Sequence, residues 1–253
     1  LKRKNIFLFL DYDGTLTPIA PRPQQALLPS GTKSLLSVLS GFAPMKVAVV
    51  SGRSLDDIRR LVGVRGLYYA GNHGLEASGP RLVFRSGQMS QTQRVLRAIR
   101  KVLETSIRDI PGAHLEDKGF SLSYHYRLVK PKDQGRARQI FRDAVSAIRD
   151  RKKIRIVAGK KVLEVRPVTR WHKGTILAWF LEHAKFPEAS RPVMPIYVGD
   201  DTTDEDAFRF LKGRGLAIRV GAARRTSAPY SLKDPADVAV FLGRLIDLER
   251  EGF

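Results

Sequence analysis

Cysteine is absent from the 253 residues, so the chain forms no disulfide framework and no thiolate metal site. The absence suits a reducing compartment, and we expect a cytoplasmic protein. No apolar run is long enough to cross a membrane, so we expect no membrane partner. We see no secretory signal either, because Leu1 to Asn5 lead directly into the first predicted strand.

Acidic residues are few: 25 Asp and Glu stand against 45 Lys and Arg, a formal net charge of +20. Such an excess concentrates anions, can steer phosphorylated substrates and permits nonspecific nucleic-acid binding. The basic runs at 2–4, 151–155 and 224–225 lack interleaved aromatic residues and match no nucleic-acid motif. We interpret them first as solvated surface and second as an electrostatic funnel, and expect no specific nucleic-acid partner.

Apolar strands alternate with helical patterns at both ends of the chain, and 43% of the residues are hydrophobic. Strands are predicted at 6–10, 46–50, 67–70, 196–198 and 216–220. Helices are predicted at 30–40, 55–62, 175–183, 204–212 and 236–250. The alternation predicts an α/β fold, a Rossmann-like parallel sheet with helices on both faces.

The middle of the chain has a different pattern. Helices at 91–110 and 134–149 each precede a strand pair, at 114–118 with 121–127 and at 154–158 with 162–166. This doubled pattern predicts an inserted α+β domain. We place the core at 1–86 and 169–253 and the insertion at 87–168, with boundaries good to a few residues.

Clustered aspartates follow two of the apolar strands. Asp11 and Asp13 follow the first, and Asp200, Asp201 and Asp204 follow the strand at 196–198. Like charges repel, and a carboxylate near an apolar core resists ionisation, so a cation must compensate them. Mg2+ prefers carboxylate oxygens and few protein ligands. One aspartate-rich turn could merely cap a strand and a helix, but two such motifs favour a metal site.

The first cluster carries the elements of phosphoryl chemistry. Asp11 and Asp13 are two residues apart, so both can point into one pocket. Gly14 and the turn it begins let backbone amides approach phosphate oxygens. One carboxylate can attack phosphorus, and the other can protonate the leaving alcohol and then activate water.

Two further segments suit the same pocket. Ser51, Gly52 and Arg53 follow the strand at 46–50, and a hydroxyl there can donate to phosphate, although Ser51 could equally cap the next helix. Lys173 stands at a helix start, where a cation opposes the helix dipole, and its placement suggests an anionic partner. The alternative for Lys173 is an ordinary surface lysine.

These segments together resemble the haloacid dehalogenase superfamily and, within it, the trehalose-6-phosphate phosphatase family. The resemblance rests on segments in the family's order across most of the chain: 11–16, 51–53, 71–76, 116–118, 125–127, 159–167, 173–174 and 199–206. The segments Glu116, Asp117, Lys118 and Glu164, Val165, Arg166, Pro167 are the more specific ones. The resemblance implies that the insertion is a cap that closes over the active site.

The resemblance also implies roles for individual residues. Asp11 is the expected nucleophile, Asp13 the acid and base, and Lys173 a further catalytic group. The phosphate-binding residues are expected to be Gly14, Thr15, Ser51, Gly52 and Arg53. The substrate-binding residues are expected to be Asn72, His73, Glu116, Lys118 and Glu164. The metal residues are expected to be Asp11, Asp13 (through its carbonyl), Asp200, Asp201 and Asp204.

Alternatives remain open at several of these positions. Arg53 can bind phosphate or pair with a core carboxylate, and either Asp201 or Asp204 can orient the metal's waters. Glu116, Lys118 and Glu164 alone would indicate a salt-bridged sheet face.

The implied activity is Mg2+-dependent hydrolysis of trehalose 6-phosphate through an aspartyl phosphate, by a monomer acting on this small molecule. A related phosphatase for sucrose 6-phosphate or a glycosyl phosphoglycerate is the rival enzyme. A basic nucleic-acid-binding protein is the rival outside enzymes.

Overall fold

The computed structural model describes residues 4–87, 89–148 and 151–251. The chain forms two compact units: Leu1–Phe84 with Trp171–Phe253, and Arg85–Arg170. Each change of unit lies within two residues of a boundary predicted from the sequence. We call these the core unit and the inserted unit.

The core unit is built on an eight-stranded sheet in the order β12-β11-β10-β1-β2-β3-β4-β5. Its strands are β1 (Asn5–Leu10), β2 (Met45–Val50), β3 (Tyr68–Gly71), β4 (Glu76–Gly79), β5 (Leu82–Arg85), β10 (Val193–Gly199), β11 (Leu216–Val220) and β12 (Tyr230–Leu232). The strands from β12 to β3 run parallel, and β4 turns back antiparallel to β3. The predicted parallel-sheet core is therefore confirmed.

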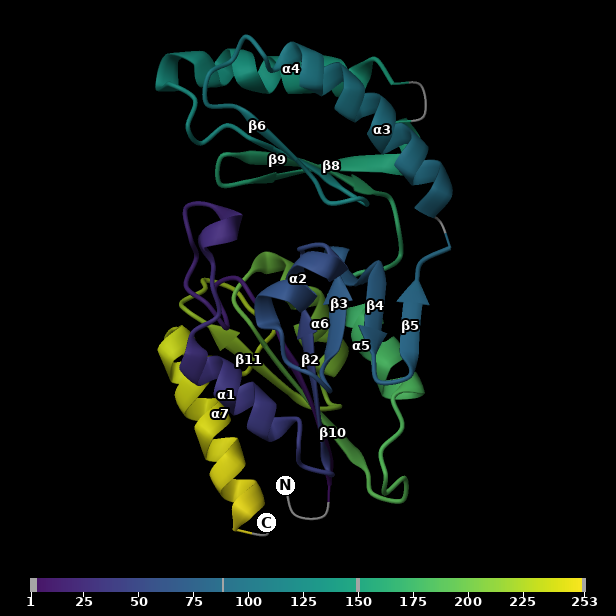
Figure 1. Cartoon of the computed structure of the whole chain (residues 1–253), viewed down its shortest axis with the longest axis vertical. Helices are drawn as coiled ribbons and strands as arrows, with labels where there is room; N and C mark the ends of the chain where they lie inside the picture. Colours follow the sequence, from purple (N-terminus) through teal and green to yellow (C-terminus); the bar gives the residue numbers. More distant parts are fainter. Residues whose placement is uncertain (1–3, 88, 149–150, 252–253) are drawn as a thin grey trace. The chain divides into compact units, whose positions relative to one another are not determined.

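Helices cover both faces of this sheet (Figure 1). They are α1 (Ser30–Leu39), α2 (Leu55–Val62), α5 (Lys173–His183), α6 (Glu205–Leu211) and α7 (Pro235–Arg250). Buried side chains of α1, α2 and α7 pack in one apolar cluster, and those of α5 and α6 pack in another. Each cluster contains residues from alternate positions of the strands, so the two clusters lie on opposite faces.

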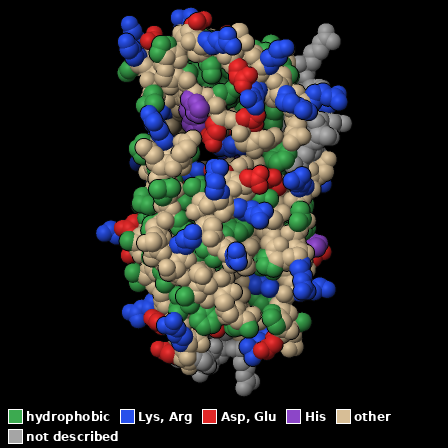
Figure 2. Space-filling view, in the orientation of Figure 1, with side chains coloured by type: hydrophobic (Ala, Val, Ile, Leu, Met, Phe, Trp, Pro, Cys, Tyr) green, Lys and Arg blue, Asp and Glu red, His purple; other side chains and the backbone are tan. Residues whose placement is uncertain are grey.

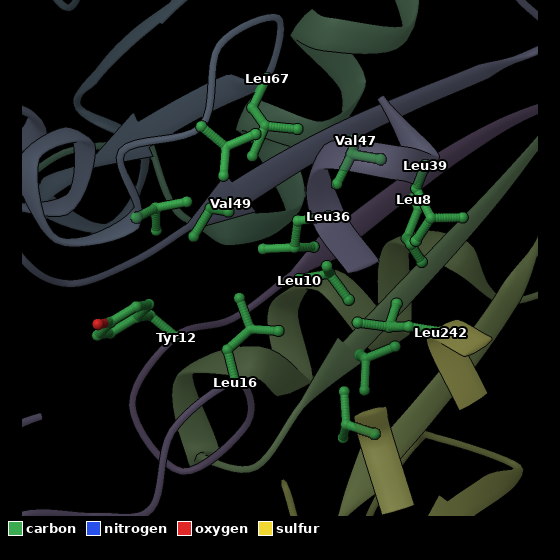
Figure 3. Close-up of a cluster of buried hydrophobic side chains, with 14 of the residues drawn as sticks. Leu8, Leu10, Tyr12, Leu16, Leu36, Leu39, Val47, Val49, Leu67 and Leu242 are labelled. Carbon is green, nitrogen blue, oxygen red and sulfur yellow. The ribbon is translucent and has the colours of Figure 1, made fainter. Parts of the chain in front are cut away.

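Strand β1 shows why the central strands read as continuous apolar runs. Leu8 and Leu10 face the cluster of α1 and α7, which Figure 3 shows with Leu36 and Leu242, whereas Phe7 and Phe9 face the other cluster. All six residues of β1 are buried. A strand covered on both faces has no polar side, and this is typical of parallel sheets between helices.

Three short strands of the core unit were not predicted: β4, β5 and β12. β5 has four residues of alternating exposure, and β12 has three, mostly exposed. Such edge segments carry too little apolar pattern to be recognised from the sequence. Two predictions fall partly outside the described residues: the helix end at Arg149, and Lys2 and Arg3 of the first basic run.

The inserted unit is a two-layer structure of helices on one face of an antiparallel sheet. It consists of α3 (Met89–Ser106), β6 (His114–Asp117), β7 (Leu122–His125), α4 (Gln134–Ser146), β8 (Ile154–Gly159) and β9 (Val162–Pro167). The sheet order is β6-β7-β9-β8, so two hairpins join through their second strands. Apolar residues of both helices pack on Tyr124, Leu163 and Val165. Two successive repeats of one helix and one hairpin build the layer, as the sequence pattern predicted.

Positive charge is concentrated in the inserted unit. Residues 85–170 contain 22 Lys and Arg against 8 Asp and Glu, so a net charge of +14 out of +20 belongs to this unit. On the face seen in Figure 2 the lysine and arginine side chains are scattered rather than joined in one band. Within the described ranges, no helix combines the length and the apolar character needed to cross a membrane.

Helix α7 offers a direct test of the core. Leu242 is fully buried against the sheet, whereas Val240 on the same helix is 63% exposed. Leu242→Ala should lower the free energy of unfolding by about 2–5 kcal/mol, because it removes buried methyl groups and leaves a cavity. Val240→Ala should change it by no more than about 0.5 kcal/mol. Urea unfolding measures both, and equal effects would contradict the packing described.

Candidate active site

The candidate site lies where parallel strands of the core unit end. Asp11 follows β1, Ser51 follows β2, and Asp200 follows β10. Because β10, β1 and β2 are parallel neighbours, their carboxyl ends meet at one edge of the sheet. Ligands of open α/β sheets bind at this edge. The fold therefore brings together segments separated by nearly 190 positions in the chain.

Three carboxylates converge there. Asp11, Asp200 and Asp204 each offer one oxygen atom, and these atoms all lie within 4.8 Å of one another. Asp11 is 5% exposed and Asp204 is fully buried. Buried like charges at this separation repel strongly, so the cluster requires a counter-charge.

Lys173 provides one counter-charge from inside the protein. Its Nζ lies 2.5 Å from Oδ1 of Asp11 and 2.6 Å from Oδ1 of Asp204, and the side chain is 2% exposed. Burial acts to lower the pKa of Lys173, but the two carboxylates raise it above its ordinary value, so the ammonium stays charged. The anionic partner expected from its position at the start of α5 is thus this pair of aspartates.

Tyr197 belongs to this network, and sequence reasoning missed it. Its hydroxyl donates to Oδ1 of Asp204 over 2.5 Å, and the backbone N–H of Asp201 donates to Oδ2 over 2.8 Å. Burial raises the pKa of Tyr197 well above its usual value, so the hydroxyl remains a donor. In the sequence, Tyr197 looks like an ordinary residue of an apolar strand. Only its position shortly before Asp200 and Asp204 in the chain could have suggested a role in the site.

The remaining charges are poorly compensated by the protein alone. If all are ionised, three carboxylates and one ammonium leave a net charge of −2. Burial raises the pKa of Asp11 well above its usual value, although Lys173 opposes this shift. Burial and the neighbouring Asp204 raise the pKa of Asp200 to about 6. Ionising all three carboxylates at neutral pH is therefore unfavourable in the protein alone, and a bound cation would favour the ionised forms.

Gly14 and Thr15 lie against the cluster as the sequence suggested. Gly14 has a φ of +90°, and a Cβ atom there would overlap the carboxylate of Asp200. Thr15 Oγ1 donates to Oδ1 of Asp200 over 3.3 Å. The turn is therefore close enough to the cluster only with glycine at this position.

The segment after β2 holds two of the predicted residues in different surroundings. Ser51 is 1% exposed, and its Oγ accepts from the backbone N–H of Arg53 over 3.1 Å. Arg53 lies on Asp13 and Asp57 rather than on the carboxylate cluster. Arg53 is thus paired with two carboxylates, and its predicted contact with phosphate stays a prediction. Ser54, not Ser51, caps α2 by accepting from Asp57.

Asn72 and His73 lie on the short helical turn η2 (Asn72–Gly74) directly after β3. Both have positive φ values, 49° and 57°. Asn72 Nδ2 donates to Oε1 of buried Glu76 over 2.8 Å, and the same oxygen accepts from the backbone N–H of Leu55. A Cβ atom at Gly52 would overlap the ring of His73, so the turn is packed against the segment after β2.

Among the described residues, the structure separates the five aspartates predicted around the metal. Asp204 is in the cluster, but Asp201 is exposed and its side chain accepts from Thr202 at the start of η5 (Thr202–Asp204). The side chain of Asp13 is 41% exposed and is held by Arg53, whereas its predicted contact with the metal through the backbone carbonyl stays a prediction. Each of the latter two side chains is engaged elsewhere, so neither joins the cluster.

In the inserted unit, Glu164 is the centre of a charged network on the sheet. Lys118 Nζ lies 3.3 Å from its Oε1, Ser121 donates to the same oxygen over 2.8 Å, and Arg166 lies on Oε2 at 2.5 Å. Glu116 Oε2 lies 2.9 Å from His125 Nε2 on the same sheet. Register places Glu116 opposite Ser123, and Ser123 opposite Glu164. These side chains therefore share the sheet face opposite to the apolar one.

One protein family matches most of the chain. The family model described as trehalose-phosphatase matches residues 9–236. The chain belongs to the trehalose-phosphatase family. The family recognised from the sequence motifs is thereby confirmed, and with it the expectation of an enzyme of the phosphatase class.

Relatives and solved structures agree with this membership. A probable trehalose-phosphate phosphatase D of Arabidopsis thaliana is 39% identical over 260 residues, covering 97% of this chain and 68% of that protein. A probable trehalose-phosphate phosphatase 4 of Oryza sativa subsp. japonica is 38% identical, and the match covers 98% of this chain and 68% of that protein. The C-terminal domain of the C. albicans trehalose-6-phosphate phosphatase has a TM-score of 0.76 at 26% identity, covering 97% and 93% of the two chains.

The cluster fits a hard divalent cation. Its donors are carboxylate oxygens, which Mg2+ prefers, and their summed charge exceeds what Lys173 compensates. Asp11, Asp200 and Asp204 are the residues positioned to hold such an ion directly or through water.

Unfolding experiments can test the uncompensated charge. Because the pKa of Asp200 is raised, ionising it costs stability as the pH rises from about 4 through 6. Asp200→Asn should therefore stabilise the metal-free protein by about 1–2 kcal/mol at pH 7.5 and by little near pH 4. Thermal unfolding in EDTA measures this. Addition of Mg2+ should raise the Tm of the unsubstituted protein more than that of the variant. A variant less stable at pH 7.5 would contradict the account.

Proposed function

We propose that the protein hydrolyses trehalose 6-phosphate to trehalose and inorganic phosphate. The observation that carries the proposal is the buried Asp11–Lys173–Asp204 network beside Asp200, at the strand ends of a chain of the trehalose-phosphatase family. A nucleophilic carboxylate with a fixed ammonium beside it suits attack on a phosphate ester. Stability alone does not account for these buried charges, because well-packed apolar side chains would stabilise the core at least as well.

Asp11 is the proposed nucleophile. Its carboxylate oxygen forms a bond to phosphorus while the bond from phosphorus to the sugar oxygen breaks, giving an aspartyl phosphate and the sugar alcohol. The carboxylate must be ionised to attack, and burial disfavours this. A bound Mg2+ ion would supply positive charge that favours the ionised carboxylate and offsets the phosphoryl charge. Lys173 stabilises the same charge from the protein side.

Asp13 is the proposed acid and base. It gives a proton to the departing sugar oxygen, and it later takes a proton from the water that attacks the aspartyl phosphate. That second attack releases phosphate and restores Asp11. Gly14, Thr15, Ser51 and Gly52 lie on the two strand-end segments beside Asp11 and are the proposed phosphate-binding residues.

Discrimination among sugar phosphates is proposed to come from the inserted unit, acting as a cap. The catalytic aspartates meet only phosphate and metal, so they cannot distinguish one sugar from another. Glu116, Lys118 and Glu164 offer charged acceptors and a donor to sugar hydroxyls, with Asn72 and His73 of the core unit beside the strand ends. Buried groups of this kind reject ligands that lack the matching hydroxyls. Sucrose 6-phosphate or a glycosyl phosphoglycerate is the alternative substrate.

The other predictions from the sequence stay predictions: a monomer, a cytoplasmic location and no specific nucleic-acid partner. On the face shown in Figure 2, the lysines and arginines form no continuous track of the kind that a nucleic-acid backbone would follow. DNA retention that falls steeply with salt, together with an absence of phosphatase turnover, would favour the rival reading.

Metal removal and one substitution test the reaction class. Phosphate release from trehalose 6-phosphate should cease in EDTA and return on addition of Mg2+. Asp11→Asn should lower the rate by about three orders of magnitude or more, because an amide is a poor nucleophile. The control is Asp247→Asn on the exposed side of α7, which should leave the rate unchanged. Full turnover in EDTA, or near-normal turnover by the Asp11 variant, would exclude the proposed mechanism.

Substrate recognition needs variants that do not simply unfold the network around Glu164. Glu164→Gln keeps the shape and removes the charge, and Lys118→Met keeps the apolar stem. Each should lower kcat/KM for trehalose 6-phosphate by about one to two orders of magnitude, since a hydrogen bond to a charged group contributes about 1.5–3 kcal/mol. Neither should change kcat/KM for para-nitrophenyl phosphate by more than about threefold.

The two substrates separate recognition from stability. Parallel losses on both would mean that Glu164 and Lys118 hold the inserted unit together. Unchanged rates on both would mean that the sugar is recognised elsewhere. Circular dichroism and Tm of each variant provide the control for folding.

A further inference from the structure

Arg53 grips the carboxylate of Asp13 at two points. Nε donates to Oδ2 of Asp13 over 2.7 Å, and an NH2 hydrogen donates to Oδ1 over 2.6 Å. Such a paired contact fixes the plane of the carboxylate as well as its distance. The arginine side chain is 8% exposed, whereas that of Asp13 is 41% exposed. The rigid partner in this pair is therefore Arg53.

Arg53 is itself fixed by the residues around it. NH1 donates to Oδ2 of Asp57 over 3.1 Å, and NH2 also donates to the carbonyl oxygen of Pro23 over 2.8 Å. The ring of Tyr12 lies 5.4 Å from the guanidinium carbon. The Tyr12 hydroxyl donates to the carbonyl of Ala26, which ties down the segment that contains Pro23. A guanidinium held at every nitrogen has little freedom to change rotamer.

These contacts leave Arg53 little capacity to bind phosphate as well. A guanidinium has five N–H donors, and four hydrogen bonds to Asp13, Asp57 and Pro23 already engage it. A two-point grip on phosphate would require breaking the grip on Asp13. The geometry thus separates Arg53 from Ser51, its neighbour in the predicted phosphate-binding segment.

We propose that Arg53 is a positioning residue that orients the Asp13 carboxylate, and that Asp57 acts through Arg53 in the same chain of contacts. The inference deepens the proposed function, because it rests on Asp13 as the acid and base of that reaction. A carboxylate has about four lone-pair sites, and Arg53 occupies two of those on Asp13. The other two can carry the proton that passes to the sugar oxygen and can later accept a proton from water. Proton transfer demands this alignment within hydrogen-bond reach.

Leaving groups of different quality reveal a positioning role. The sugar alkoxide must be protonated as it departs, whereas para-nitrophenolate leaves without help. The ratio kcat/KM reports steps up to departure of the leaving group. Arg53→Gln should therefore lower kcat/KM for trehalose 6-phosphate by about ten- to a hundredfold, and that for para-nitrophenyl phosphate by less than about threefold. Asp57→Asn should lower the two kcat/KM values in the same pattern as Arg53→Gln, but by smaller factors.

Two variants serve as matched controls. Arg60 also contacts Asp57, at 2.6 Å, but it is 79% exposed and does not touch Asp13. Arg60→Gln should leave both substrates unchanged. Arg53→Lys keeps the positive charge but loses the planar fork, so it should retain the defect on trehalose 6-phosphate. Recovery of the normal ratio by Arg53→Lys would overturn the orienting role, because charge alone would then suffice.

The parallel variant Asp13→Asn separates failure of this inference from failure of the proposed function. A selective loss on trehalose 6-phosphate by the Asp13 and Arg53 variants alike supports the inference. A selective loss by the Asp13 variant with an equal loss on both substrates by Arg53→Gln overturns it and assigns Arg53 to phosphate binding. No selective loss in the Asp13 variant refutes the acid–base role itself. If Arg53→Gln fails to fold, Asp57→Asn carries the same comparison, and an unchanged substrate ratio there overturns the inference.

Discussion

The ammonium of Lys173 between the carboxylates of Asp11 and Asp204 is the interaction on which the rest of the candidate site depends. It joins residues 162 and 31 positions apart, from before and after the inserted unit, so only the completed core unit can form it. Without the lysine, two buried carboxylates would face one another with no charge between them, a situation that costs several kcal/mol. The same lysine is insufficient for three carboxylates. Lys173 thus compensates part of the charge, and a bound cation would compensate the remainder.

The sheet can hold such an unfavourable cluster because its strands are apolar on both faces. Asp11 and Asp200 project only after β1 and β10 have ended, where the backbone leaves the core. The rest of each strand buries large side chains such as Phe7 and Leu8, which supply the burial that offsets the charge repulsion. Concentrating the cost at strand ends is a general way for a stable scaffold to carry a strained site. Gly14 fits this arrangement, because any side chain there would displace Asp200.

The sequence was informative where a residue's environment follows from its neighbours in the chain. The run before Asp11 is continuously apolar, and this predicts a buried parallel strand and hence the position of the aspartate at its end. β12 has no such run, and its pairing with β11 depends on tertiary context. The different surroundings of Asp201 and Asp204 depend on the turn η5, where both side chains form the capping box but only Asp204 also faces the buried cluster. Tyr197 occupies an apolar position of its strand but uses its hydroxyl as a hydrogen-bond donor to Asp204, so hydrophobic periodicity could not reveal its role.

The inserted unit raises a different physical question, because Glu164 is already well satisfied by its own neighbours. Lys118, Ser121 and Arg166 engage both of its oxygens. A sugar hydroxyl that binds there must share or replace one of these donors, so little net free energy comes from matching the network. A ligand that displaced one of these donors without replacing its hydrogen bond, however, would leave the buried carboxylate of Glu164 with an unpaired oxygen and lose much more. A network of this kind therefore contributes more to discrimination than to affinity. Under the proposed function, this asymmetry would let the core unit keep a chemistry common to phosphate esters while the inserted unit selects the ester.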